Sequence, residues 1–123
     1  MMTTAGEVGT NAGLTADQLG VLRNRLERVR GQLLVRLARD QAVARAAEPE
    51  IEELDAAEQT REQDDAALRV EYDRGQLREV EHALRRIEAG RYGVSEISGE
   101  PISYQRLLAL PWARYDSDED PSG

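Results

Sequence analysis

Apolar residues recur at alternating steps of three and four residues in two stretches of the chain. The first stretch carries Leu19, Leu22, Leu26, Val29 and Leu33, and the second carries Leu77, Val80, Leu84 and Ile87. This spacing places the apolar side chains in a narrow stripe along one face of a helix, as in a coiled coil. The sequence therefore predicts two long helices, each burying its stripe against one partner helix.

Local signals indicate where these helices begin and end. Thr15 and Gln18 match a capping box, in which two side chains pair with the first free amide groups of a helix. Pro49 ends the first helix, because proline has no amide hydrogen and its ring crowds the preceding turn. The second helix is expected from about Ile51 to Glu88.

The positions of the two stripes favour a hairpin within one chain. The strong ends of the stripes meet when the helices run antiparallel, which gives a hairpin over residues 14–90 with its tip near residues 48–57. The same stripe would also suit a dimer of two chains, because many self-associating coiled coils carry it. The hairpin prediction rests on Pro49 and on the register of the two ends.

The chain changes character on both sides of the predicted helices. Residues 1–13 are rich in Gly, Thr and Ala, carry no hydrophobic period and are expected to be disordered. Residues 91–115 are rich in turn formers and aromatic side chains, which indicates a small globule. Residues 116–123 read as an acidic, frayed tail.

Composition and charge exclude several kinds of site. The formal net charge of −8 disfavours a surface for nucleic-acid phosphates. The absence of cysteine excludes disulfides and thiolate metal sites. No signal-peptide or membrane-span pattern is visible, so we expect a cytoplasmic protein without a membrane partner. No nucleophile and base converge, so no enzyme is predicted, and His82 is expected on an exposed helix face.

The stretch YGVSEISGEPI at residues 92–102 resembles the C-terminal zinc module of the DksA/TraR family of RNA-polymerase-binding regulators. The frame of that module is kept by Gly93, Gly99, Glu100, Ile102, Arg106, Leu107, Ala109, Pro111, Ala113 and Arg114. The family's four cysteine positions carry Ser95, Ser98, Asp116 and Glu119. Serine hydroxyls are poor ligands for zinc, and the two carboxylates could bind a hard cation but, on a tail, would form only a weak site. The resemblance therefore implies a zinc-ribbon-like globule without metal.

A globule without zinc needs another source of stability. A structural zinc ion contributes ~10 kcal/mol or more, whereas each buried apolar side chain contributes about 1.5–3 kcal/mol. Several such side chains could offset the loss of the metal. The candidates are Tyr92, Val94, Ile97, Ile102, Leu107, Leu110 and Trp112.

The resemblance continues into the predicted tip of the hairpin. The family motif Asp-x-x-Asp-x-Ala aligns without gaps on Glu52, Asp55 and Ala57. In the family this tip lies in the secondary channel of RNA polymerase, near the active site. Acidic residues alone would indicate only a solvated helix start, which the helix dipole favours. The resemblance also leaves Arg91, Arg106 and Arg114 as exposed candidates for docking the globule on the polymerase exterior.

These inferences together predict an all-α protein: a long antiparallel coiled-coil hairpin with a metal-free globule. Its implied role is that of a monomeric transcription regulator that binds RNA polymerase and does not read DNA. The family's ppGpp-responsive members carry a basic residue where this chain has Glu79, so a ppGpp response is doubtful. A coiled-coil scaffold that has lost polymerase binding stays open as an alternative, as does a transcript-cleavage factor acting through the same channel.

Overall fold

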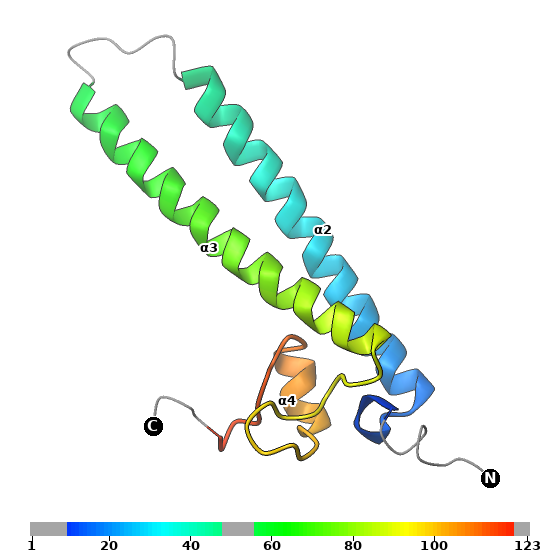
Figure 1. Ribbon diagram of the computed structural model, residues 1–123. Helices are drawn as coiled ribbons and strands as arrows, with labels where there is room; N and C mark the ends of the chain where they lie inside the picture. Colours follow the sequence, from blue (N-terminus) through cyan, green and yellow to red (C-terminus); the bar gives the residue numbers. More distant parts are fainter. Residues whose placement is uncertain (1–9, 48–55, 120–123) are drawn as a thin grey trace. The chain divides into compact units, whose positions relative to one another are not determined.

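The computed structural model describes residues 10–47 and 56–119 (Figure 1). These residues form the 3-10 turn η1 (Thr10–Gly13), the long helices α2 (Ala16–Ala47) and α3 (Ala56–Glu88), and the short helix α4 (Tyr104–Ala109). Over the described ranges no strand forms, and one isolated bridge links Val94 to Pro101. The predicted all-α fold class is confirmed.

The chain divides into two compact units, and both long helices run through both of them. Unit 1 comprises described residues 10–29 and 79–119, and unit 2 comprises residues 30–47 and 56–78. Within each unit, taken by itself, α2 and α3 run antiparallel (Figure 1). None of the described helices is long and apolar enough to cross a bilayer.

The predicted apolar stripes form the contact between the two long helices. In unit 1, Leu22, Leu26 and Val80 are completely buried. In unit 2, Leu33 and Leu37 are buried on the same face of α2. Burying side chains of this size contributes about 1.5–3 kcal/mol each, which makes the stripes the main source of helix pairing.

The predicted capping box begins α2. The Thr15 amide donates to Oε1 of Gln18 at 3.0 Å, and the Gln18 amide donates to Oγ1 of Thr15 at 3.0 Å. Each side chain thus satisfies an amide that has no partner within the helix. The predicted helix start at Thr15 is confirmed.

The segment just before α2 departs from the predicted disorder of residues 1–13. Asn11 is buried, its amide donates to the carbonyl of Gly90 at 2.8 Å, and its Oδ1 accepts from the amide of Tyr92 at 3.0 Å. Asn11 has a φ of 50°, a left-handed conformation that asparagine tolerates better than most residues. Residues 10–13 are therefore part of unit 1, where they satisfy backbone groups that follow α3.

The C-terminal globule buries part of the predicted apolar set. Tyr92, Ile102 and Leu107 are buried, and the Tyr92 hydroxyl donates to the Pro111 carbonyl at 2.8 Å. Val94, Leu110 and Trp112 are half-buried. Ile97 was expected in this core and is 52% exposed, in a turn where its amide donates to Oγ of Ser95. Burial alone is therefore a smaller source of stability than predicted.

Candidate functional site

The predicted tip lies largely outside the described residues. Glu52 and Asp55 belong to the segment that the structure does not describe, and so does Pro49. Ala57 is in the first turn of α3, and its side chain is likewise outside the described set. The tip assignment stays a prediction.

Ser95 and Ser98, the first pair of positions where the resemblance would place cysteines, lie in a tight turn. Ser95 is buried, and its Oγ accepts from the amides of Ile97 at 3.1 Å and Ser98 at 3.2 Å. The Gly99 amide donates to the Ser95 carbonyl at 3.0 Å, which closes the turn. The hydroxyl of Ser98 accepts from the Glu100 amide at 3.2 Å.

The second pair shapes another turn, which corrects the predicted tail. Asp116 Oδ2 accepts from the amide of Ser103 at 2.9 Å, next to the start of α4. The Asp116 amide donates to Oε1 of Glu119 at 3.0 Å, and the Glu119 amide donates to the Asp116 carbonyl at 3.0 Å. Residues 116–119 therefore belong to the globule, because their carboxylates accept backbone donors within it. The sequence placed them in a frayed tail.

Glu119 joins the two turns. Its pKa is lowered, chiefly because the Ser98 hydroxyl donates to its carboxylate, with the Asp116 amide and the Ser95 hydroxyl acting in the same direction. The pKa of Asp116 is also lowered, first by the amide of Ser103 and then by that of Ser117. Hydrogen bonds connect Asp116 to Glu119, and the hydroxyls of Ser98 and Ser95 lower the pKa of Glu119.

These four positions do not fit a zinc ion. Zinc in structural sites takes four ligands, mostly thiolate and imidazole. Here two of the four are neutral hydroxyls, and both carboxylates already accept hydrogen bonds from the globule. In the part of the chain that the structure covers, no group of three or more His, Cys, Asp or Glu side chains is arranged to hold a metal ion.

An ion network links α3 to the first turn of the globule and to Arg114. Arg114 makes a two-point pair with Glu79, at 2.7 Å from Nε to Oε1 and 3.0 Å from Nη2 to Oε2. The same guanidinium reaches Oε1 of Glu96 at 3.2 Å, and the Glu96 amide donates to the Arg114 carbonyl at 2.7 Å. The pKa of Glu79 is lowered by the Arg114 hydrogen bonds. Arg114 therefore fastens the first turn to α3.

His82 and Arg86 complete this network from the last turns of α3. His82 Nε2 lies 2.7 Å from Oε2 of Glu96, and Arg86 Nη1 lies 3.0 Å from the same oxygen. Burial acts to raise the pKa of Glu96, but hydrogen bonds from His82 and Arg114 outweigh it, so the pKa is lowered. The His82 side chain is 27% exposed, whereas the sequence placed it on a solvated face. The residues that cover it come from the globule.

Comparison with solved structures finds a match along nearly the whole chain. The fold is similar to that of transcription factor DksA2 from Pseudomonas aeruginosa, with a TM-score of 0.80 and 26% identity over 94% of this chain and 92% of that one. The match includes both long helices and the C-terminal module. The chain therefore has a DksA-like fold, and it contains no cysteine.

Sequence comparison finds relatives that the chain matches over part of their length. The chain is 37% identical over 112 residues to the uncharacterized protein YteA of Bacillus subtilis, covering 81% of this chain. It is 50% identical over 44 residues to general stress protein 16O of the same organism. It spans 46% of YteA and 27% of general stress protein 16O, less than half of each relative. No family model matches the chain.

The three arginines predicted as docking candidates differ in exposure. Arg91 is exposed, as predicted, whereas Arg106 and Arg114 are half-buried. Arg114 is held by Glu79 and Glu96, so its charge is already balanced within the globule. The Arg106 Nε atom is buried and has no hydrogen-bond partner among the described residues. The predicted exposure holds for Arg91 and not for Arg106 or Arg114, and the docking role of all three stays a prediction.

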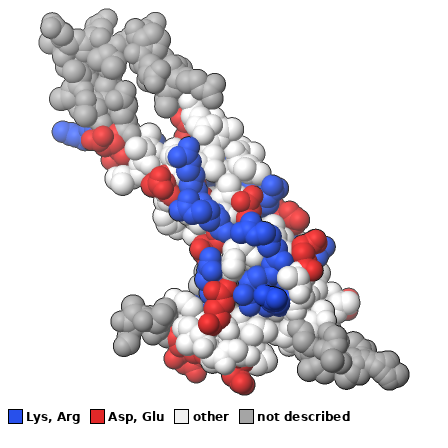
Figure 2. All heavy atoms as spheres, viewed as in Figure 1, with Lys and Arg blue, Asp and Glu red and all other residues white. Residues whose placement is uncertain are grey.

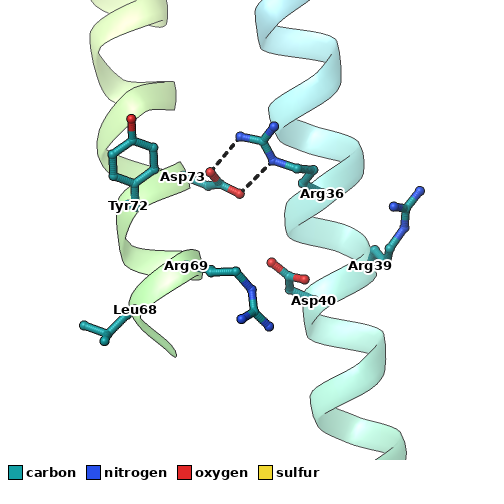
Figure 3. Close-up of a pocket in the computed structure, with 7 residues that line it drawn as sticks. All are labelled: Arg36, Arg39, Asp40, Leu68, Arg69, Tyr72 and Asp73. Atoms are coloured by element: carbon teal, nitrogen blue, oxygen red, sulfur yellow. Dashed lines mark hydrogen bonds and ion pairs between the residues drawn. The ribbon is translucent and has the colours of Figure 1, made fainter. Parts of the chain in front are cut away.

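One central residue was missed from the sequence. Asp73 lies in the apolar stripe of α3, three residues after Val70 and four before Leu77, and it is 5% exposed. Its carboxylate accepts from Nη2 of Arg36 at 2.8 Å and from Nε at 3.1 Å (Figure 3). The Arg36 hydrogen bonds lower the pKa of Asp73. The sequence did contain a signal for Asp73. An aspartate at a position of the apolar stripe becomes buried when the helices pair, and a buried carboxylate requires a partner on the facing helix.

Proposed function

We propose that this DksA/TraR-like protein regulates transcription by binding RNA polymerase directly, through the secondary channel, and that it does not recognise DNA. The likeness to transcription factor DksA2 over 94% of the chain carries the proposal. It spans the two long helices, which would enter the channel, and the C-terminal module, which would stay outside. In this proposal Glu52, Asp55 and Ala57 act near the polymerase active site, and Arg91 contacts the exterior.

The surface charge supports binding to protein in preference to nucleic acid. The net charge is −8, and Figure 2 shows acidic and basic side chains interspersed over one face of the molecule. A surface that follows a nucleic-acid backbone gains most of its affinity from clustered positive charge. The proposed regulator therefore acts on the enzyme and not on the promoter sequence.

The packing of the helices supports a monomer over a scaffold. Leu22, Leu26 and Leu33 carry the stripe that would mediate association of two chains. Their exposures in the single chain are 0%, 0% and 2%. A dimer through this stripe would first require the helices of each chain to separate, which costs the burial they already make.

The test is a binding and transcription experiment with tip variants. The wild-type protein is expected to co-purify with RNA polymerase and to change transcription from a sensitive promoter. Glu52→Ala/Asp55→Ala is expected to bind within about threefold of wild type, a difference of about 0.7 kcal/mol, and to lose the transcriptional effect. Asp64→Ala/Asp65→Ala removes two exposed carboxylates from the same helix and serves as the matched control.

Two results would contradict this proposal. Absence of binding by the wild-type protein would contradict polymerase binding. A tip variant that regulates as well as wild type would contradict the tip assignment. Transcript cleavage in stalled elongation complexes, lost in the tip variant, would instead assign the cleavage activity that the sequence left open.

A further inference from the structure

The turn η1 holds three consecutive residues in the left-handed backbone conformation. Asn11, Ala12 and Gly13 have φ angles of 50°, 58° and 74°. Glycine adopts this conformation freely and asparagine tolerates it, but in alanine the Cβ atom crowds the following carbonyl oxygen. Ala12 is therefore a strained position. Such strain persists only where the surrounding contacts oppose it, and it often marks a segment that changes conformation.

The contacts of η1 reach the segment that joins α3 to the globule. The Asn11 amide donates to the Gly90 carbonyl at 2.8 Å, and the Tyr92 amide donates to Oδ1 of Asn11 at 3.0 Å. Ala12 lies directly against Gly93, because a Cβ atom added to that glycine would be 3.2 Å from the Cβ of Ala12. Two neutral hydrogen bonds and one close contact thus tie η1 to the start of the globule.

The other polar contacts that hold the globule to the long helices in unit 1 involve charged side chains. The ion network of Glu96 and Arg114 joins the globule to α3, and its side chains are between 22% and 36% exposed. From α2, the Arg25 guanidinium donates to the Leu108 carbonyl at 2.8 Å in an exposed position. Salt screens partly exposed ion pairs, but it does not screen hydrogen bonds between neutral groups. The globule is therefore attached by polar contacts of two kinds, which differ in their response to salt.

We propose that η1 is a latch: when closed it fixes the globule to the end of α3, and when open it leaves the globule attached through charged contacts that salt loosens. Opening is local, because it breaks the two hydrogen bonds of Asn11 and releases the strain at Ala12. Gly90 and Gly93 flank the segment that η1 then releases, and glycine is the residue whose backbone turns most freely. The latch acts in the free protein, so the inference goes beyond the proposed function and does not depend on it.

Three variants change the backbone strain without touching the hydrogen bonds of Asn11. Gly13→Ala adds strain in open space, because an added Cβ meets nothing within 4 Å, and Ala12→Gly relieves strain. Gly99→Ala is the matched control. It adds a Cβ at a similar φ of +77° and also in open space, but in the turn that Ser95 closes.

Hydrogen exchange of single amides, measured by NMR, reports whether η1 is open. The Asn11 and Tyr92 amides are protected by the closed latch. The Leu107 amide donates to the Ser103 carbonyl at 3.1 Å and reports unfolding of the globule instead. In the wild-type protein the Tyr92 amide should exchange faster than the Leu107 amide, because opening of the latch is less costly than unfolding.

The variants are expected to shift exchange of the Tyr92 amide in opposite directions. Gly13→Ala should accelerate it at least about fivefold, Ala12→Gly should slow it about fivefold, and Gly99→Ala should leave it within about twofold of wild type. If η1 were only a packed turn, Ala12→Gly would instead accelerate exchange, because glycine adds backbone freedom to the unfolded chain.

A distance measurement tests the response to salt. The chain has no cysteine, so two spin labels can be placed on cysteines introduced at Arg85 in α3 and Gln105 in α4, both exposed. With Gly13→Ala, electron paramagnetic resonance should show a second, longer distance whose population grows at least about threefold between about 0.1 M and about 1 M NaCl. With Ala12→Gly, a single distance should remain at both salt concentrations.

Several results would overturn the latch. One is equal acceleration of Tyr92 exchange by Gly13→Ala and Gly99→Ala, and another is Ala12→Gly exchange that is no slower than wild type. Equal exchange rates at the Tyr92 and Leu107 amides would show that η1 opens only when the globule unfolds. A distance distribution that ignores salt in Gly13→Ala would show that η1 does not control the attachment of the globule.

Discussion

Arg36 and Asp73 form a two-point ion pair between α2 and α3, in which the carboxylate is buried and the guanidinium is half exposed. The Arg36 side chain is 52% exposed and that of Asp73 is 7% exposed. Because of this difference in exposure, losing one partner and losing the other should have different effects on stability. Loss of the arginine leaves a buried charge without a partner, whereas loss of the aspartate leaves an arginine that water can solvate.

The first prediction follows from this inequality. Arg36→Ala should lower the free energy of unfolding by about 2–4 kcal/mol, because an unpaired buried carboxylate is costly. Asp73→Leu should be nearly neutral or stabilising, because leucine completes the apolar stripe. Urea denaturation of both variants measures the difference, and Arg39→Ala at an exposed site is the control. Equal losses for Arg36→Ala and Asp73→Leu would contradict the account of this pair.

The second prediction concerns the stability of the protein at low pH. The pKa values of Asp73, Glu79 and Glu96 are all lowered in the folded protein. Their ion pairs therefore contribute full stability above the ordinary carboxyl pKa of about 4, and this contribution is lost as pH falls through the lower folded values. The free energy of unfolding should decline below about pH 4. Asp73→Leu should flatten that decline, and an identical pH profile would be inconsistent with a charged Asp73.

The third prediction concerns metal. Excess EDTA should leave the thermal unfolding and the Trp112 fluorescence of the globule unchanged, and added zinc should not raise the melting temperature. A ligand that binds only the folded state stabilises it in proportion to the logarithm of its concentration, so even a weak site would be visible at high zinc. A zinc-dependent rise in melting temperature would show that the globule binds zinc. It would contradict the account in which the hydrogen-bonded turns around Glu119 stabilise the globule in place of a metal.

The fourth prediction compares two glycines with similar backbones. Gly93 has φ +85° and Gly99 has φ +77°, so alanine is strained at both positions. An added Cβ at Gly93 would lie 3.2 Å from the Cβ of Ala12, whereas one at Gly99 would meet nothing within 4 Å. Gly93→Ala should therefore lower the free energy of unfolding more than Gly99→Ala, which should cost about 1 kcal/mol. Equal losses in chemical denaturation would mean that η1 does not pack against Gly93.

Local signals predicted the helical part of the fold. The stripe from Leu19 to Leu33 and the capping box at Thr15 depend on residues three or four positions apart, so the sequence displays them directly. Asn11 could not be recognised in this way. Its partner Tyr92 is 81 positions away, and the hydrogen bond joins a side chain to a backbone amide.

In the globule, too, the sequence predicted local features but not the contacts between residues far apart in the chain. The family frame located Ser95, Ser98, Asp116 and Glu119, but it did not show that Glu119 would hydrogen-bond to the first turn. Periodicity along α3 placed His82 on the side away from α2 and implied that this side faces water. The globule covers that side, because Glu96 and Arg114 arrive from segments with no hydrophobic period.

Direct binding to RNA polymerase is the central claim, and fluorescence anisotropy with labelled wild-type protein and purified core enzyme tests it most directly. We predict saturable binding with a Kd of about 1 µM or tighter, corresponding to about 8 kcal/mol of binding free energy. Unlabelled protein should displace the label, whereas double-stranded DNA should not. An anisotropy that stays at the value of the free protein throughout the titration, or a label that DNA displaces, would contradict the proposed function.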